Sequence, residues 1–315
     1  MAAAVALLAA GAFVLPAGVQ AQHQHHHDHG DAHAHHDHAG GPVECRTLAG
    51  PPWSGLPGND LELVRRVEAS VAQFANPEAA RAAGFRPAFG HIPTMGVHWI
   101  HAGRMARGFN VDEPDHLMFA RIGDREELVG VAFAFMGSLD AEVPTAFESE
   151  LAAWHDHPEL GPRDQTLHML HVWFVDSPYG PFAGNNFALP YGVRGIAAPD
   201  PCWLTSDEEV ERFELVASTL SLLAQLGDDE GRAVEPGAIG ALRGPLRDQF
   251  QRGLERLEGW EVALDVAARN GDHHGWVRAA EGLLGALRPA ELRAVENVRA
   301  LVKGVQEPGA LRQGG

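Results

Sequence analysis

Residues 128–136 read LVGVAFAFM, an apolar run without a single polar side chain. Such a run predicts a strand that is buried on both faces, because a half-exposed strand would alternate apolar with polar residues. Three further runs of β type occur nearby, namely GVHWIH at 96–101, HLMFARI at 116–122 and LHMLHVWFV at 167–175. Glycine, proline and aromatic residues are also frequent in this part of the chain. These runs predict a compact β-rich domain.

Helical patterns flank this region on both sides. Before it, LELVRRVEASVAQFA at 61–75 has helical spacing, and Pro77 opens a shorter helix that Gly84 closes. After it, capping-box pairs formed by Thr205 with Glu208 and by Ser206 with Glu209 predict a helix that ends at Gly227. Further helices are expected over 245–257, 260–270, 273–287 and 289–303.

The predicted fold class is therefore α+β. A β-rich domain with N-terminal helices is expected over 42–203, and an α-helical, bundle-like region is expected over 204–315. Between them, the segment 176–203 is long and rich in Gly, Pro and aromatic residues. A loop of this length is uncommon unless it is functional or held in place, and Cys202 near its end is the expected point of attachment.

The N-terminus has the pattern of a signal peptide. An apolar run from Ala2 to Leu15 is too short to span a membrane comfortably, and Val19 and Ala21 are small residues at signal-peptidase spacing. A basic n-region is missing. We expect residues 1–21 to be removed before Gln22, which places the mature protein in the periplasm or outside the cell without an integral membrane span.

The chain has two cysteines, Cys45 and Cys202, which lie 157 positions apart. In an oxidising compartment this minimal, even count predicts one disulfide, and two unpaired buried thiols are the alternative. Closing a loop of this length contributes about 4–5 kcal/mol to stability on the chain-entropy model.

The 315-residue chain carries a formal net charge of −18, which argues against nucleic acid and anionic membranes as partners. The sequence has no Gly-x-Ser-x-Gly, phosphate loop or dinucleotide-binding fingerprint. These patterns leave metal chemistry as the function that the residues indicate most directly.

Residues 22–41 read QHQHHHDHGDAHAHHDHAGG and form a His-rich tail that cannot bury a core. Imidazole suits Zn, Cu and Ni, so the tail is predicted to collect such ions, and a soluble spacer is the alternative. The predicted ligands are its histidines, His23, His25, His26, His27, His29, His33, His35, His36 and His38.

Eight more histidines lie in the predicted β-rich domain: His91, His98, His101, His116, His155, His157, His168 and His171. On a strand, residues i and i+2 share a face, whereas His168 and His171 are three apart and point to opposite faces. We expect an internal metal site of His98, His171 and one of His155 or His157. His168 and Glu148 are weaker candidates, and hydrogen-bonded core histidines are the alternative.

Several motifs occur in an order that resembles an uncharacterised family of exported bacterial proteins. They are AARAAGF at 79–85, MGVH at 95–98 followed by Trp99, PDHLMFA at 114–120, LVGVAF at 128–133, LHVWF at 170–174, SPYGPFAGN at 177–185 and Cys202. The match covers about residues 60–203. The resemblance implies an exported, compact β-rich domain with His98 and His171 as paired histidines, and it implies no reaction. The chain departs from the family at Ala132, where relatives often have Glu.

The sequence therefore suggests three functions. The first is an exported protein that captures or buffers a transition metal, and Zn or Cu is the expected ion. The second is a metal-dependent hydrolase or oxygenase whose metal-bound water reacts at an internal His site. The third is a structural or interaction domain whose histidines serve packing.

Overall fold

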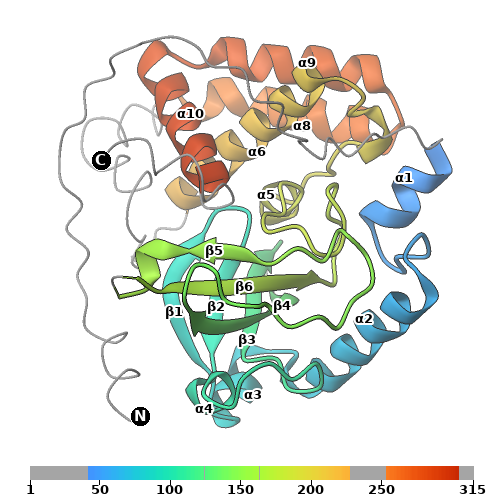
Figure 1. The fold of residues 1–315 in the computed structure, drawn as a ribbon. Coiled ribbons are helices and arrows are strands. Elements are labelled where there is room, and N and C mark those ends of the chain that lie inside the picture. The colour runs from blue at the N-terminus through green and yellow to red at the C-terminus, as the bar shows by residue number, and fades with distance from the viewer. Residues whose placement is uncertain (1–41, 124, 163, 228–252, 305–315) are drawn as a thin grey trace, which may run out of the picture.

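The computed structural model describes residues 42–304 except 124, 163 and 228–252 (Figure 1). The predicted signal peptide, the whole His-rich tail and most of the helix expected over 245–257 lie outside the described residues. Among the helices that are described, none is both long and apolar enough to cross a membrane. The division of the chain near residue 204 stays a prediction.

The described chain combines one antiparallel sheet with many helices, as the α+β prediction stated. The strands are β1 (Arg86–Ile92), β2 (Gly96–Ile100), β3 (His116–Ile122), β4 (Arg125–Gly137), β5 (His155–His157) and β6 (Thr166–Trp173), in the spatial order β1-β2-β3-β4-β6-β5. The four strands expected from apolar runs are therefore confirmed as β2, β3, β4 and β6. The short edge strands β1 and β5 were not predicted as elements.

The helices lie before, between and after the strands. They are α1 (Pro42–Ala49), α2 (Gly58–Val71), α3 (Pro77–Ala82), α4 (Ala102–Met105), α5 (Leu189–Val193), α6 (Asp207–Gly227), α8 (Leu254–Arg269), α9 (His273–Ala286) and α10 (Pro289–Gly304). Short 3₁₀ turns cover Ala72–Phe74 (η2), Pro158–Leu160 (η3) and Pro201–Trp203 (η4).

The helix boundaries mostly follow the expected signals. Of the two predicted capping pairs, Ser206 with Glu209 is formed in part, since the Ser206 hydroxyl accepts from the Glu209 amide at 3.3 Å. The Glu209 carboxylate accepts from the Thr205 amide at 3.2 Å, and Glu208 pairs with Arg212 instead of Thr205. Gly271 follows α8 at φ +67°, which is the conformation of a glycine C-cap. The break expected between 257 and 260 is wrong, because α8 runs through Gly259 without interruption.

One face of the sheet is apolar and packs against the N-terminal helices. Strand residues Leu117, Phe119, Val131, Phe133, Leu170 and Val172 form a buried cluster with α2 residues Val64, Val67 and Val71. This packing uses the apolar stripe that helical spacing predicted for α2. Figure 1 shows α2 running alongside the sheet.

A second core lies among the helices of the C-terminal part, which gather at one end of the molecule in Figure 1. Phe187 and Tyr191 from the 176–203 segment belong to this core, and so does Phe213 of α6. The buried Glu214 of α6 also receives a hydrogen bond of 3.1 Å from the Tyr179 hydroxyl and an ion pair of 2.7 Å from Arg299 of α10. The long segment is therefore fixed against the helices by apolar contacts and by the hydrogen bond from Tyr179 to Glu214.

Candidate functional site

The face of the sheet opposite α2 carries five histidines from four strands, here called the His cluster: His98, His116, His155, His157 and His171. His116 of β3 and His171 of β6 both pair with Ala132 of β4, and paired residues of antiparallel strands point to the same side. His98 lies two residues before Ile100, which pairs with His116. His155 pairs with Met169, which lies two residues before His171. Alternation along each strand therefore places all five side chains on one face.

Strand β4 makes room for this cluster. Its residues on the His face are Gly130, Ala132 and Ala134, whereas Val131 and Phe133 point to the apolar face. The run LVGVAFAFM thus alternates large with small residues although it never alternates apolar with polar ones. Small side chains in the middle of the face let imidazoles from the neighbouring strands extend over β4.

The imidazoles of His98 and His171 meet although β3 and β4 separate their strands. Their Nε2 atoms lie 3.5 Å apart. In a flat sheet, strands three positions apart would be separated by about 14 Å, so the sheet must curve toward its His face. Two nitrogens bound to one tetrahedral zinc lie about 3.3–3.4 Å apart, given Zn–N bonds of about 2.0–2.1 Å. The pair therefore already has the spacing of two ligands of one ion.

The orientation of His171 is set by the 176–203 segment. Its Nδ1 donates a hydrogen bond of 2.8 Å to the carbonyl oxygen of Gly184, which leaves Nε2 as the nitrogen with a lone pair. Trp173, two residues further along β6, likewise donates through Nε1 to the carbonyl of Ala183. This segment therefore selects the tautomer in which Nε2 of His171 faces His98.

His116 has a comparable arrangement with a carboxylate. Its Nδ1 forms a hydrogen bond with Oδ1 of Asp115, and Oδ2 of Asp115 accepts a hydrogen bond of 3.2 Å from the Ala134 amide. The Nε2 atom of His116 is buried and has no hydrogen-bond partner among the described residues, and the same holds for Nδ1 of His98. Carboxylate–histidine pairs of this kind typically orient metal ligands.

Burial favours the neutral form of three members of the cluster, His98, His155 and His171. The side chains of His98, His116 and His171 are all 3% exposed or less. Desolvation, reinforced by the neighbouring histidines, lowers the pKa of His98 and of His155 well below the usual value, and it lowers the pKa of His171 to about 3. Neutral imidazole is the form that binds transition metals.

The remaining two histidines of the cluster come from the edge strand β5. The ring of His155 lies 4.9 Å from that of His171 and 5.0 Å from that of His157, measured between centroids. His155 and His157 were expected to share a face if this segment is extended. The structure agrees, because both residues lie in β5 and pair with β6 residues two apart. Nε2 of His155 is buried without a hydrogen-bond partner in the described part of the chain.

His168 does not join the cluster. It pairs with Phe135 on the apolar side, so it lies on the face opposite His171, as the three-residue spacing indicated. Its ring stacks on Phe135 at 4.7 Å, Nδ1 contacts Asp156 at 2.6 Å and Nε2 contacts the Ser138 carbonyl at 2.9 Å. Both ring nitrogens thus have partners, and the structure supports a packing role for this residue.

Glu148 also lies away from the His cluster. Its carboxylate accepts a hydrogen bond of 2.8 Å from Asn59, and its amide donates to the buried Asp60 at the start of α2. His101 caps α4 by accepting from the Arg104 amide. The nine predicted ligands in the His-rich tail lie outside the described residues.

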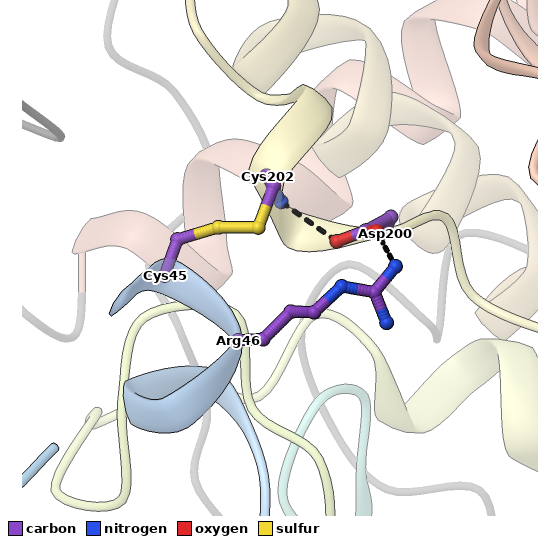
Figure 2. Close-up of a disulfide and its surroundings, with 4 residues drawn as sticks. All are labelled: Cys45, Arg46, Asp200 and Cys202. Carbon is purple, nitrogen blue, oxygen red and sulfur yellow. Dashed lines mark hydrogen bonds and ion pairs between the residues drawn. A yellow bond between two sulfur atoms is a disulfide. The ribbon is translucent and has the colours of Figure 1, made fainter. Parts of the chain in front are cut away.

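The predicted disulfide is present. Cys45 of α1 and Cys202 of η4 are bonded with their Cα atoms 5.6 Å apart, and Figure 2 shows Arg46 bonded to Asp200 beside them. Asp200 and the two cysteines form the one group of three potential ligand atoms in the described part of the chain that lie within 4.8 Å of each other. Both sulfurs are consumed by the disulfide, so this group has no thiolate to offer.

In the His cluster, no three ring nitrogens all lie within 4.8 Å of one another. The Nε2 atoms of His98 and His171 already lie at the spacing of two metal ligands. A third imidazole has to rotate toward them to complete a three-nitrogen site. The ring of His116, 6.1 Å from that of His98, is the most buried candidate and has the Asp115 carboxylate behind it.

Soft sulfur atoms also border the His cluster. Met118 lies directly opposite His98 in the register of β2 and β3, and Met169 lies directly opposite His155. Both are buried, and Met105 of α4 packs against the small apolar cluster that contains Met169. Thioethers are ligands for Cu(I) more than for Zn.

A cavity of about 530 Å³ lies elsewhere, between α2 and the start of β4. Its lining includes Glu68, Ala72, Arg125 and Phe174 and contains no histidine. The cavity is therefore separate from the residues that the sequence predicted as ligands.

Sequence reasoning found four of the five members of the cluster and did not select His116. The signal that could have identified it is the Asp115–His116 dipeptide at the start of a strand, because an adjacent carboxylate is a common partner of a ligating imidazole. Comparison of the chain with family models, curated proteins and solved structures finds no match. The resemblance to a family of exported proteins therefore stays a prediction.

Proposed function

We propose that the protein is an exported binding protein for a transition metal, zinc or copper, that holds one ion on the His face of its sheet. His98, His116 and His171 are the proposed ligands. The observation that carries the proposal is the 3.5 Å approach of the His98 and His171 Nε2 atoms, with Nδ1 of His171 engaged by Gly184. The His-rich tail is proposed to collect ions for this site.

The polar atoms of the cluster favour binding over packing. Histidines that only fill a core usually have both ring nitrogens hydrogen-bonded, as His168 does. In contrast, Nε2 of His116 lacks a partner within the described chain. A bound metal would give Nε2 of His116 a partner, and it would let Nε2 of His98 coordinate rather than share a proton with His171.

An enzymatic role is the second candidate. Three imidazole ligands leave a fourth position for water or substrate, and the 176–203 segment touches the site through Gly184. An enzyme would also need a substrate pocket at the metal, and the 530 Å³ cavity does not provide it, because none of the cluster lines that cavity. We therefore favour metal binding.

The test uses the exported chain with all nine tail histidines changed to Asn, so that the tail contributes no imidazole ligands. After incubation with Zn(II) or with copper and then desalting, elemental analysis should find about one equivalent of metal. His98→Ala and His171→Ala should each abolish retention, and His274→Ala, at an exposed histidine of α9, should not. Retention of no metal by the parent chain would refute the proposal, provided that circular dichroism shows it folded.

A further inference from the structure

The His cluster holds more imidazoles than one ion requires, and they form a row. Successive ring centroids are 5.0 Å apart from His157 to His155, 4.9 Å from His155 to His171, 5.6 Å from His171 to His98 and 6.1 Å from His98 to His116. Each ring thus lies beside the next one, from the edge strand β5 to β3 inside the sheet. A zinc or copper site is complete with three or four such ligands.

His155 is the most exposed of the five histidines, and the other four are buried. His155 is partly exposed and His157 is 6% exposed, whereas His98, His171 and His116 are 3%, 1% and 0% exposed. An ion arriving from solution therefore meets His155 first, and the ring of His157 lies 5.0 Å from it on the same strand. Bare metal ions do not cross an apolar interior unaided, because loss of their hydration shell has to be offset by new ligands at every step.

We infer that His155 and His157 form an entry site, which receives a metal ion from solution and passes it to the inner site of His98, His116 and His171. This inference rests on the proposed function. The pair points to the same face as His171, and Nε2 of His155 has no other hydrogen-bond partner among the described residues.

The transfer is a ligand exchange without any redox step. The ion leaves the nitrogen of His155 as a bond to Nε2 of His171 forms, and His98 then replaces the second β5 ligand or a water molecule. All of the imidazoles act as neutral two-electron donors, so the exchange needs no oxidant, reductant or net proton transfer. His171 is the natural acceptor, because it neighbours both His155 and His98.

This assignment gives the edge strand a role that differs from that of the inner ligands. Loss of an inner ligand removes the bound ion, whereas loss of the entry site delays its arrival without changing the final complex. The rate of loading and the amount bound at equilibrium therefore report on different residues.

The experiment follows metal loading in the full chain with Asn at the nine tail positions. Zn(II) or Cu(II) is mixed with the protein, and the appearance of metal that resists a fast chelator is timed by quenching. His155→Asn combined with His157→Asn should slow loading by about tenfold or more, while about one equivalent is still bound at equilibrium. Changing His273 and His274 to Asn is the matched control, since their rings also neighbour each other, at 5.6 Å, on α9.

Because His157 is buried, the single variant His155→Asn at the partly exposed position is measured as well, and thermal unfolding checks each fold. An unchanged loading rate in folded variants would overturn the inference. Loss of the equilibrium complex in His155→Asn, as in His98→Ala, would also overturn it, since His155 would then be an inner ligand. If the parent chain binds no metal at all, the proposed function fails instead.

Discussion

The side-chain amide of Asn185 donates a hydrogen bond of 2.9 Å to the main-chain carbonyl of Val302, and it thereby ties the segment beside the His cluster to α10. The preceding residue, Gly184, holds the ring of His171. The Asn185 carbonyl oxygen also accepts from the Thr94 hydroxyl at 2.8 Å, next to β2. Two adjacent residues thus connect the proposed metal site, the sheet and the last described helix.

Asn185→Ala should consequently destabilise the protein by about 1–3 kcal/mol, because it leaves the buried Thr94 hydroxyl and Val302 carbonyl without this partner. It should also weaken metal binding, though less than His171→Ala does, since the Gly184 carbonyl is retained. Denaturant unfolding and metal titration measure the two effects. Asn59→Ala removes an exposed hydrogen bond to Glu148 and should cost less, and equal stabilities of the two variants would contradict the prediction.

The metal-free protein should lose stability as the pH falls from about 6.5 toward 3. Burial depresses the pKa of His98, His155 and His171 in the folded state, so below the unfolded value of 6.5 the unfolded chain binds protons that the folded chain does not. Above pH 6.5 both states are neutral at these residues and the contribution vanishes. Each such proton adds a slope of up to about 1.4 kcal/mol per pH unit.

The measurement is denaturant unfolding of chelator-treated protein at several pH values. His171→Gln should flatten the slope between pH 6.5 and 3, and His274→Gln at an exposed position should leave it unchanged. A parent chain whose stability is constant over this range would contradict the assignment of buried, neutral imidazoles.

The parts of the fold that the sequence predicted are those with strong local signals. The run 128–136 identified β4, because a strand buried on both faces has to be apolar throughout, and shorter runs of β type identified β2, β3 and β6. The edge strand β1 reads RPAFGHI, and its proline and glycine are typical of turns, so pairing with β2 rather than propensity makes it a strand. β5 has only three residues, which is too short for any periodicity.

The candidate site was predictable only in part for a similar reason. Alternation places His155 with His157 and separates His168 from His171, and both statements need one strand alone. Whether His116 faces His98 depends on the register between β2 and β3 and on the curvature of the sheet, which are set by tertiary packing. Ala132 of β4 pairs with both His116 and His171, so a longer residue at this position would enter the space between the two histidines.

The disulfide should be essential to the attachment of η4 and of the segment that contains Gly184. Cys45→Ser combined with Cys202→Ser is expected to reduce stability by about 2–5 kcal/mol, because a closed loop of 157 positions constrains the unfolded chain. Unfolding of the oxidised protein with and without a reducing agent gives the same quantity without mutation. The reductant should have no effect on the double variant, and any difference there would point to a cause other than this bond.

The identity of the metal can be tested through Met118 and Met169, which border the His cluster from β3 and β6. If the ion is Cu(I), a thioether should join the imidazoles, and Met118→Leu or Met169→Leu should weaken Cu(I) binding by about tenfold while Zn(II) binding stays constant. Leucine keeps the packing at a cost usually below about 1.5 kcal/mol, so the change isolates the sulfur. Competition with a Cu(I) chelator in the chain with Asn at the tail positions measures this, and Met136→Leu, at an exposed residue of β4, is the control. An equal loss of Cu(I) and Zn(II) affinity would show that the substitution acts through packing. Unchanged Cu(I) affinity in both variants would show that only nitrogen ligands bind the ion.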